Sequence, residues 1–167
     1  YEQAKARGAE MLAEVIGFAM SSDAADIVTP SQQGAARAIE GVLQDAGLNP
    51  ENVGYINAHG TGTAANDKTE CAAVADVFGA HAKKLMISST KSMHGHLIGA
   101  TGAVELLACI MAVRDGVIAP TIGYQEADPE CTLDVVPNHA REASVTVALS
   151  NAFAFGGMNA VLALRAV

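Results

Sequence analysis

Short apolar runs and stretches of helical spacing follow one another along the whole chain. Apolar runs bounded by polar or glycine-containing segments predict strands, at residues 12–20, 53–58, 85–88, 144–150 and 160–165. Apolar positions three and four residues apart predict helices, at residues 2–7, 31–47, 66–78 and from about residue 103 to Gly116. Because strands alternate with helices and the last two strands are adjacent, the pattern predicts an α/β layered domain with a mixed five-stranded sheet flanked by helices.

The helix that ends near Gly116 has apolar residues around most of its circumference. These residues are Val104, Leu106, Leu107, Ile110, Met111 and Val113. A helix that is apolar on all sides is usually buried, so we expect this one to lie in the interior. The segment 117–142 that follows contains three prolines and is predicted to be irregular.

Length and charge exclude several classes of protein. A chain of 167 residues predicts one domain. The formal net charge of −8 argues against a nucleic acid or an anionic membrane as the main partner, because both attract basic surfaces. No apolar run reaches the roughly 18 residues that a membrane span needs. The polar start, YEQAKARG, is unlike a signal peptide, and we expect Tyr1 to be a processed or arbitrary boundary.

Cys71, Cys109 and Cys131 are the cysteines of the chain. Their odd number and their spacing match no metal-binding or disulfide framework. We therefore expect three structural thiols in a protein of the reducing cytoplasm.

Three polar, glycine-containing loops follow predicted strands. They are NAHGTGT at 57–63, KSMHGH at 91–96 and NAFAFGGMN at 151–159. Open α/β sheets bind their ligands at the carboxyl ends of strands, so we expect the loops to converge. One imidazole from each of the first two loops would stabilise an enolate or oxyanion, and the lysine ammonium of the second loop would favour an anionic substrate. Free amides at Phe155 and Gly156 would form half of a second oxyanion hole. This constellation suits carbon–carbon bond chemistry at a thioester, but it lacks a nucleophile.

Each of these residues also has a plainer interpretation. HGTGT by itself is compatible with a turn whose threonine caps a helix. His94 and His96 have the spacing of two zinc ligands, although a third ligand is missing. His81 and His139 lie among polar residues and are expected to be exposed. Glu105 would need a partner if it is buried, and Lys91 would satisfy it.

The segments NAHGTGTAANDKTE, SSTKSMHGHLIGATGAVE and SNAFAFGGMNA resemble, in order and spacing, the carboxyl-terminal motifs of the elongating β-ketoacyl-[acyl carrier protein] synthases, which belong to the thiolase-like superfamily. Nodulation-type synthases and polyketide ketosynthases share these motifs. The likeness runs from about residue 2 to the end. It implies that residues 1–167 are the carboxyl-terminal half of a fold built from two similar βαβαβαββ halves.

The resemblance assigns catalytic roles to the residues that match the motifs. His59 and His96 are similar to the pair that binds the malonyl thioester carbonyl and stabilises the enolate. Lys91 resembles the lysine that orders the site electrostatically, and Glu105 matches the glutamate that pairs with it. Phe155 resembles the gating phenylalanine, whose amide belongs to the oxyanion hole.

The resemblance also implies a binding site for the substrate arm. Thr61 and Thr63 are similar to the threonines that hydrogen-bond phosphopantetheine, and Gly156 belongs to the same substrate-binding set. The chain departs from the family pattern at His94, where a threonine or another small residue is usual, at Ala154, where glycine is usual, and at Met158, where threonine is usual. Glycine reaches backbone conformations that alanine cannot, so Ala154 would restrict the gate, and Met158 would change the acyl pocket. We therefore expect an altered acyl-chain preference.

The implied function is decarboxylative Claisen condensation of an acyl thioester with malonyl-carrier protein, in the biosynthesis of fatty acids or related acyl chains. The expected enzyme is an acyltransferase without metal, nicotinamide or flavin, because phosphopantetheine arrives on the acyl carrier protein. Its nucleophilic cysteine lies in the other half, so this fragment is expected to be inactive alone. The implied partners are the carrier, the amino-terminal half of the enzyme and a second copy in a homodimer.

Two other classes of function share the fold. One is a non-catalytic subunit of the chain-length-factor type, against which the retention of His59, Lys91 and His96 argues. The other is a thiolase or degradative relative that uses free coenzyme A. The combination of HGTGT with a lysine five residues before a histidine favours the synthase branch.

Overall fold

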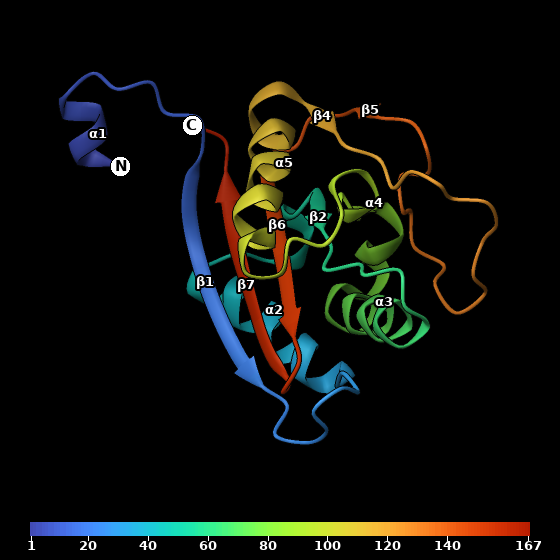
Figure 1. Cartoon of the computed structure of the whole chain (residues 1–167). Coiled ribbons are helices and arrows are strands. Elements are labelled where there is room, and N and C mark those ends of the chain that lie inside the picture. The colour runs from blue at the N-terminus through green and yellow to red at the C-terminus, as the bar shows by residue number, and fades with distance from the viewer.

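The computed structural model describes all residues from 1 to 167 and contains one large mixed sheet. Its five strands lie in the order β1-β7-β6-β2-β3 (Figure 1). Their bounds are Glu14–Ser22 for β1, Tyr55–Asn57 for β2, Met86–Ser88 for β3, Val147–Ala154 for β6 and Met158–Arg165 for β7. β2 is parallel to both β3 and β6, whereas β7 is antiparallel to β1 and β6. The predicted α/β class and mixed five-stranded sheet are confirmed.

Helices cover both faces of this sheet. The α-helices are α1 (Glu2–Ala6), α2 (Gln32–Asp45), α3 (Ala64–Phe78), α4 (Lys91–His94) and α5 (Thr101–Asp115), with 3-10 turns η1 (Pro50–Asn52), η2 (Gly79–Lys84) and η3 (Ile98–Ala100). α2 and α3 pack against one face, and α5 packs against the other (Figure 1). No helix combines the length and the apolar character that a membrane crossing requires.

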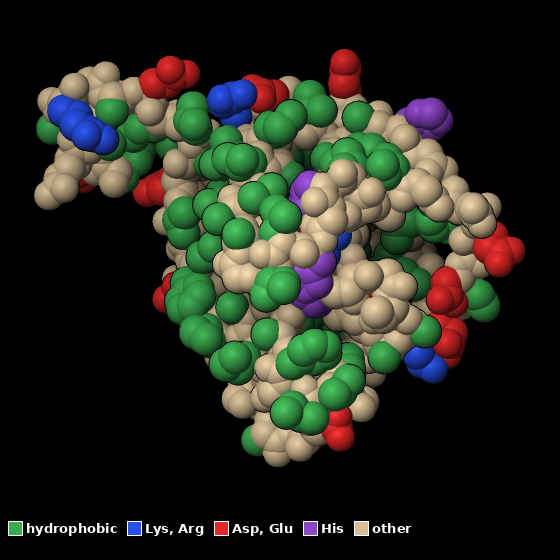
Figure 2. All heavy atoms as spheres, in the orientation of Figure 1, with side chains coloured by type: hydrophobic (Ala, Val, Ile, Leu, Met, Phe, Trp, Pro, Cys, Tyr) green, Lys and Arg blue, Asp and Glu red, His purple; other side chains and the backbone are tan.

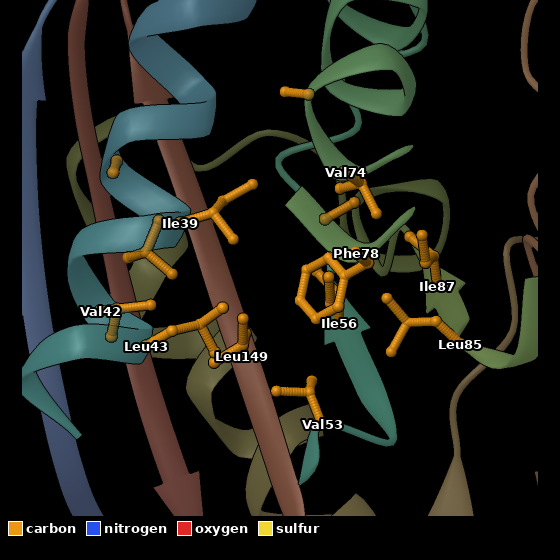
Figure 3. Close-up of a cluster of buried hydrophobic side chains, with 14 of the residues drawn as sticks. Ile39, Val42, Leu43, Val53, Ile56, Val74, Phe78, Leu85, Ile87 and Leu149 are labelled. Carbon is orange, nitrogen blue, oxygen red and sulfur yellow. The ribbon is translucent and has the colours of Figure 1, made fainter. Parts of the chain in front are cut away.

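Alternate residues of the strands supply two separate hydrophobic cores. Leu149 of β6 and Ile56 of β2 face the larger core, beneath Ile39 of α2 and Phe78 of α3 (Figure 3). The preceding residue of β6, Ala148, faces the smaller core on the side of α5. This alternation follows from the period of two in a β-strand, and it gives both faces of the sheet an apolar lining.

The expectation that α5 is largely buried holds on only one side of the helix. Its inner side is buried against the sheet, but Leu107 and Met111 are exposed. Phe18 and Met20 of β1 are exposed as well, and Figure 2 shows hydrophobic side chains spread over much of this face. The helix has only one sheet to pack against in this chain, so its outer apolar side has no neighbour.

The segment predicted as a loop between the last two strands is mostly strand. β6 runs to Ala154 and β7 starts at Met158, with these two residues paired, so only residues 155–157 form the turn. The segment 117–142 is largely irregular, as predicted, apart from the short pair β4 (Val117–Ile118) and β5 (Arg141–Glu142).

The expectation of three unpaired thiols is also wrong. Cys71 of α3 forms a disulfide with Cys131, which lies in the irregular segment, and their Cα atoms are 5.6 Å apart. Spacing along the chain could not show this pair, because it depends on how the irregular segment folds back over α3. Cys109 is a free, buried thiol within α5, in agreement with its predicted structural role.

Candidate active site

Two loops meet at the carboxyl ends of the neighbouring parallel strands β2 and β3. His59 follows β2, and Lys91 and His96 follow β3. The ring centroids of His59 and His96 are 5.7 Å apart, with the two ring planes nearly perpendicular. The tertiary structure therefore brings the two predicted imidazoles together across the two loops.

The side chain of Glu70, in α3, binds the backbone of the His59 loop. Its buried carboxylate accepts hydrogen bonds from the backbone N–H groups of His59 and Gly60, both at 2.9 Å, and from the Asn151 side chain at 3.0 Å. Burial raises the pKa of Glu70, while these hydrogen bonds act in the opposite direction. Sequence analysis assigned no role to Glu70, which lies within the helix predicted at residues 66–78. Glu70 lies on the inner side of the helix that directly follows the loop, and this position is the sequence feature from which its contact with the loop could have been predicted.

Gly60 allows this loop to lie close to the neighbouring one. Its φ of +42° is in the left-handed region, and a Cβ atom there would lie 2.5 Å from Ser89 Cβ. The Ser89 hydroxyl donates a hydrogen bond to the Gly60 carbonyl oxygen at 2.5 Å. A glycine is therefore required for the close approach of the His59 and Lys91 loops.

Lys91 and Glu105 form a buried ion pair. Lys91 Nζ contacts Glu105 Oε1, and the side chains are almost completely shielded from solvent. Burial raises the pKa of Glu105, and the hydrogen bond and charge of Lys91 oppose this effect. The pair implied by the resemblance is thus present, with the lysine held inside the protein rather than on its surface.

Hydrogen bonds determine which nitrogen of His96 carries its proton. The Ile98 N–H donates to His96 Nδ1 at 3.1 Å, so Nδ1 is an acceptor. The Thr101 hydroxyl lies 3.0 Å from the same nitrogen. The neutral ring therefore carries its proton on Nε2, which is the orientation that a hydrogen-bond donor to a substrate needs.

His59 is a neutral imidazole at physiological pH. Burial, followed by the ammonium of Lys91 and the nearby His96 ring, lowers the pKa of His59 to about 3. Its Nδ1 is buried and has no partner, so Nε2 is the nitrogen left to meet a ligand. The Phe153 ring, 5.7 Å away between centroids, packs beside it. Phe153 is itself buried, and nothing in the sequence indicated its contact with His59.

The lowered pKa of His59 makes stability dependent on pH. Between its folded value of about 3 and its usual value of 6.5, the unfolded chain binds the proton and the folded chain does not. The contribution of His59 to stability is therefore fully present above pH 6.5 and is lost as the pH falls toward 3, at about 1.4 kcal/mol per pH unit at most. Urea unfolding across that interval should show a smaller loss for His59→Gln. His139→Gln, at an exposed position, should keep the parent slope, and equal slopes for both variants would contradict the prediction.

Thr61 and Thr63 lie beside His59 at the amino end of α3. Their hydroxyl oxygens are 3.0 Å apart, and Thr63 Oγ1 caps the helix by accepting the Asn66 N–H. Thr63 is exposed and Thr61 is half-buried, so both hydroxyls lie near the surface of the loop.

Phe155 and Gly156 occupy the turn between β6 and β7. Phe155 is 76% exposed. The Gly156 N–H donates to the Ile27 carbonyl oxygen at 2.8 Å, so the expectation of a free oxyanion-hole amide at Gly156 is wrong. Gly156 has a φ of +80°, and this turn directs its amide toward the loop after β1. Only the Phe155 amide of this pair lacks a protein acceptor.

Other contacts hold the rings of His94 and His81. Both ring nitrogens of His94 have partners, with Nδ1 donating to the Gly95 carbonyl at 2.7 Å and Nε2 lying 3.1 Å from Thr90 Oγ1. His81 is half-buried and its Nε2 donates to the Val53 carbonyl oxygen, which corrects its expected exposure. No group of three or more His, Cys, Asp or Glu side chains is arranged to hold a metal ion.

Residues 12–125 match the family described as "Beta-ketoacyl synthase, C-terminal domain". The chain belongs to this family. Over 167 residues it is 58% identical to nodulation protein E of Rhizobium leguminosarum bv. trifolii, covering 100% of this chain and 41% of that protein. Over 166 residues it is 50% identical to 3-oxoacyl-[acyl-carrier-protein] synthase 2 of Synechocystis sp., covering 98% of this chain and 40% of that protein. β-Ketoacyl synthases are acyltransferases.

Solved ketosynthases have the same fold. The ishigamide ketosynthase/chain length factor superposes with a TM-score of 0.96 at 49% identity, covering 99% of this chain and 41% of that one. A type II polyketide ketosynthase, solved in complex with its acyl-carrier protein, has a TM-score of 0.96 at 39% identity, covering 100% of this chain and 41% of that one. The chain thus spans about two fifths of the length of the relatives it matches. These matches confirm the predicted family resemblance.

Proposed function

We propose that this chain supplies the decarboxylation wall of a 3-oxoacyl-[acyl carrier protein] synthase. The observation that carries the proposal is the pair of imidazoles on adjacent loops, with His59 neutral and His96 holding its proton on Nε2. Two such N–H donors suit one oxygen atom whose negative charge grows during the reaction.

In the proposed reaction, the malonyl thioester carbonyl lies between His59 Nε2 and His96 Nε2. The bond to the carboxylate breaks, carbon dioxide leaves, and the electron pair of that bond forms the enolate. The imidazole donors stabilise the enolate oxygen more strongly than the neutral carbonyl, which is the condition for acceleration. The enolate carbon then attacks the acyl thioester, and the acyl-carrying cysteine thiolate, contributed by the other half, leaves.

Lys91 and the substrate-binding residues support this step. The buried ammonium of Lys91 lowers the pKa of His59 and thereby favours the neutral ring. We propose that Thr61 and Thr63 bind the phosphopantetheine arm of the carrier, and that Phe155 is the acyl gate whose free amide serves the oxyanion hole. The enzyme needs no cofactor of its own, because the carrier brings the prosthetic group.

The exposed apolar face supports a proposal for where the rest of the synthase binds. Leu107 and Met111 of α5 and Phe18 and Met20 of β1 are exposed together with Ile98. The chain spans about two fifths of its relatives, so a large part of a complete synthase is available to cover this surface. We propose that the amino-terminal half covers it and that the complete enzyme is a cytoplasmic homodimer. The relative solved with its acyl-carrier protein supports that carrier as the partner.

The test is carbon dioxide release from malonyl-carrier protein. We expect release by the complete synthase and none by this chain alone, because the chain provides one wall of the site. The test variant is His96→Ala, and His139→Ala is its control, since His139 is exposed. A complete synthase without any release would overturn the proposed function and favour a non-catalytic subunit. His96-dependent release by the chain alone would show that the other half is dispensable for decarboxylation.

A further inference from the structure

The disulfide between Cys71 and Cys131 joins two regions that flank the candidate site. Cys71 lies in α3, and Cys131 lies 60 residues further along the chain in the irregular segment. The intervening chain carries both Lys91 and His96. Both bonded cysteines are half-buried, so a small reagent can reach the bond from solvent.

Hydrogen bonds connect both sides of the disulfide to the His59 loop. On one side, Cys71 directly follows Glu70, whose carboxylate accepts the backbone N–H groups of His59 and Gly60. On the other side, the segment that carries Cys131 begins near Thr121, whose hydroxyl oxygen accepts the Ser89 N–H at 3.0 Å. Ser89 in turn donates to the Gly60 carbonyl oxygen. The N–H of Gly60 is therefore connected to the Cys71 side of the disulfide, and the carbonyl oxygen of Gly60 is connected to the Cys131 side.

A cavity of about 170 Å³ lies between these two sides. Its lining includes both bonded cysteines together with Gly60, Glu70 and Thr121. Residues that border a void lose few packing contacts when they move. Near Cys131 the segment is also joined to α3 by the Lys68–Glu130 ion pair, which is exposed and therefore a weak restraint. The disulfide is the strong link between α3 and this part of the segment.

We propose that Cys71 and Cys131 form a reversible thiol–disulfide exchange site, and that its oxidation state sets the mobility of the His59 loop. Its reagents are small thiols and their disulfides, of the glutathione class. This inference rests on the bond and its contacts, and it is independent of the proposed decarboxylation.

The exchange is balanced without any other oxidant. An external thiolate attacks one cysteine Sγ, the S–S bond breaks, and the second cysteine leaves as a thiolate that takes up a proton. A second external thiol then resolves the mixed disulfide. The products are two protein thiols and one external disulfide, with two electrons transferred to the protein. The reverse reaction with the external disulfide restores the bond.

The first test counts alkylated cysteines in the chain. The chain is equilibrated with mixtures of glutathione and glutathione disulfide, quenched with acid, alkylated in denaturant and weighed by mass spectrometry. We expect three modified cysteines in the most reducing mixture and one, Cys109, in the most oxidising mixture. The two others should be lost together, and Cys109→Ala should lower both counts by one. Three modified cysteines throughout, or stable glutathione adducts in place of paired loss, would overturn the proposal.

The second test measures amide hydrogen exchange in the oxidised and reduced forms of the unaltered chain. Reduction should speed exchange at His59 and Gly60 about tenfold, because local opening becomes easier. Leu149, in the centre of the sheet, is the internal reference and should not change. Cys131→Ser should show the fast exchange in every redox mixture. Unchanged exchange at His59 and Gly60, or an equal increase at Leu149, would overturn the coupling.

Discussion

Replacing Lys91 with methionine is expected to lower the free energy of unfolding by about 3–5 kcal/mol, because it leaves a buried carboxylate without its counter-charge. Lys91 is 7% exposed and its partner Glu105 is completely buried. Burial already raises the pKa of Glu105 against the opposing effect of Lys91. Without the lysine the carboxyl accepts a proton more readily, so the loss in stability should shrink at low pH, where the acid is neutral in both the folded and the unfolded chain.

Lys68→Met is the matched control for this prediction. Lys68 pairs with Glu130, but both side chains are more than half exposed, so the change should have a much smaller effect. The double variant Lys91→Met/Glu105→Leu should recover most of the lost stability, because it removes the unpaired charge as well. Urea unfolding of all three variants measures the difference. Equal losses in Lys91→Met and Lys68→Met would mean that the buried pair contributes no special stability.

In the complete synthase, His96→Ala should lower the rate of malonyl decarboxylation by about 10²–10³, the range for removing one donor of an oxyanion hole. The neutral His96 ring has its proton on Nε2, because the Ile98 amide occupies Nδ1. Loss of this N–H removes an interaction that strengthens as the enolate forms. Binding of the malonyl substrate should change less, so the effect should appear in kcat rather than in KM.

Two measurements separate this role from a purely structural one. Transfer of the acyl group to the nucleophilic cysteine does not require an enolate, so it should proceed in His96→Ala at close to the parent rate. His139→Ala, at an exposed position, should leave both steps unchanged. If His96→Ala slows both steps equally, the residue maintains the shape of the site and is not the proposed donor.

The predicted strands and helices match the observed ones closely wherever the pattern is local. Ser31 was expected to open α2, and its hydroxyl accepts the Gly34 amide as the helix cap. Element ends were less accurate, as the extension of β6 and β7 into the supposed loop shows. Ladder hydrogen bonds between two strands support residues whose own sequence is typical of a loop.

The placement of His59, Lys91 and His96 on loops after neighbouring strands could be predicted, because the motifs follow short apolar runs. The hydrogen bonds that support these loops could not be predicted. Glu70 reaches Asn151 across 81 residues of sequence. The Gly156 amide bonds to the Ile27 carbonyl oxygen, although the pattern of the three loops predicted that it was free. Such contacts depend on which elements become neighbours in space.

The sequence by itself determined the fold class, the family and the residues that carry the proposed chemistry, because helix and strand periods and compact motifs are local properties. Only the tertiary structure decided three further features. It joined Cys71 to Cys131, it left the outer side of α5 without a neighbour, and it placed Glu70 beneath His59. Each of these results from packing between segments far apart in the chain, and no local pattern of residues records that packing.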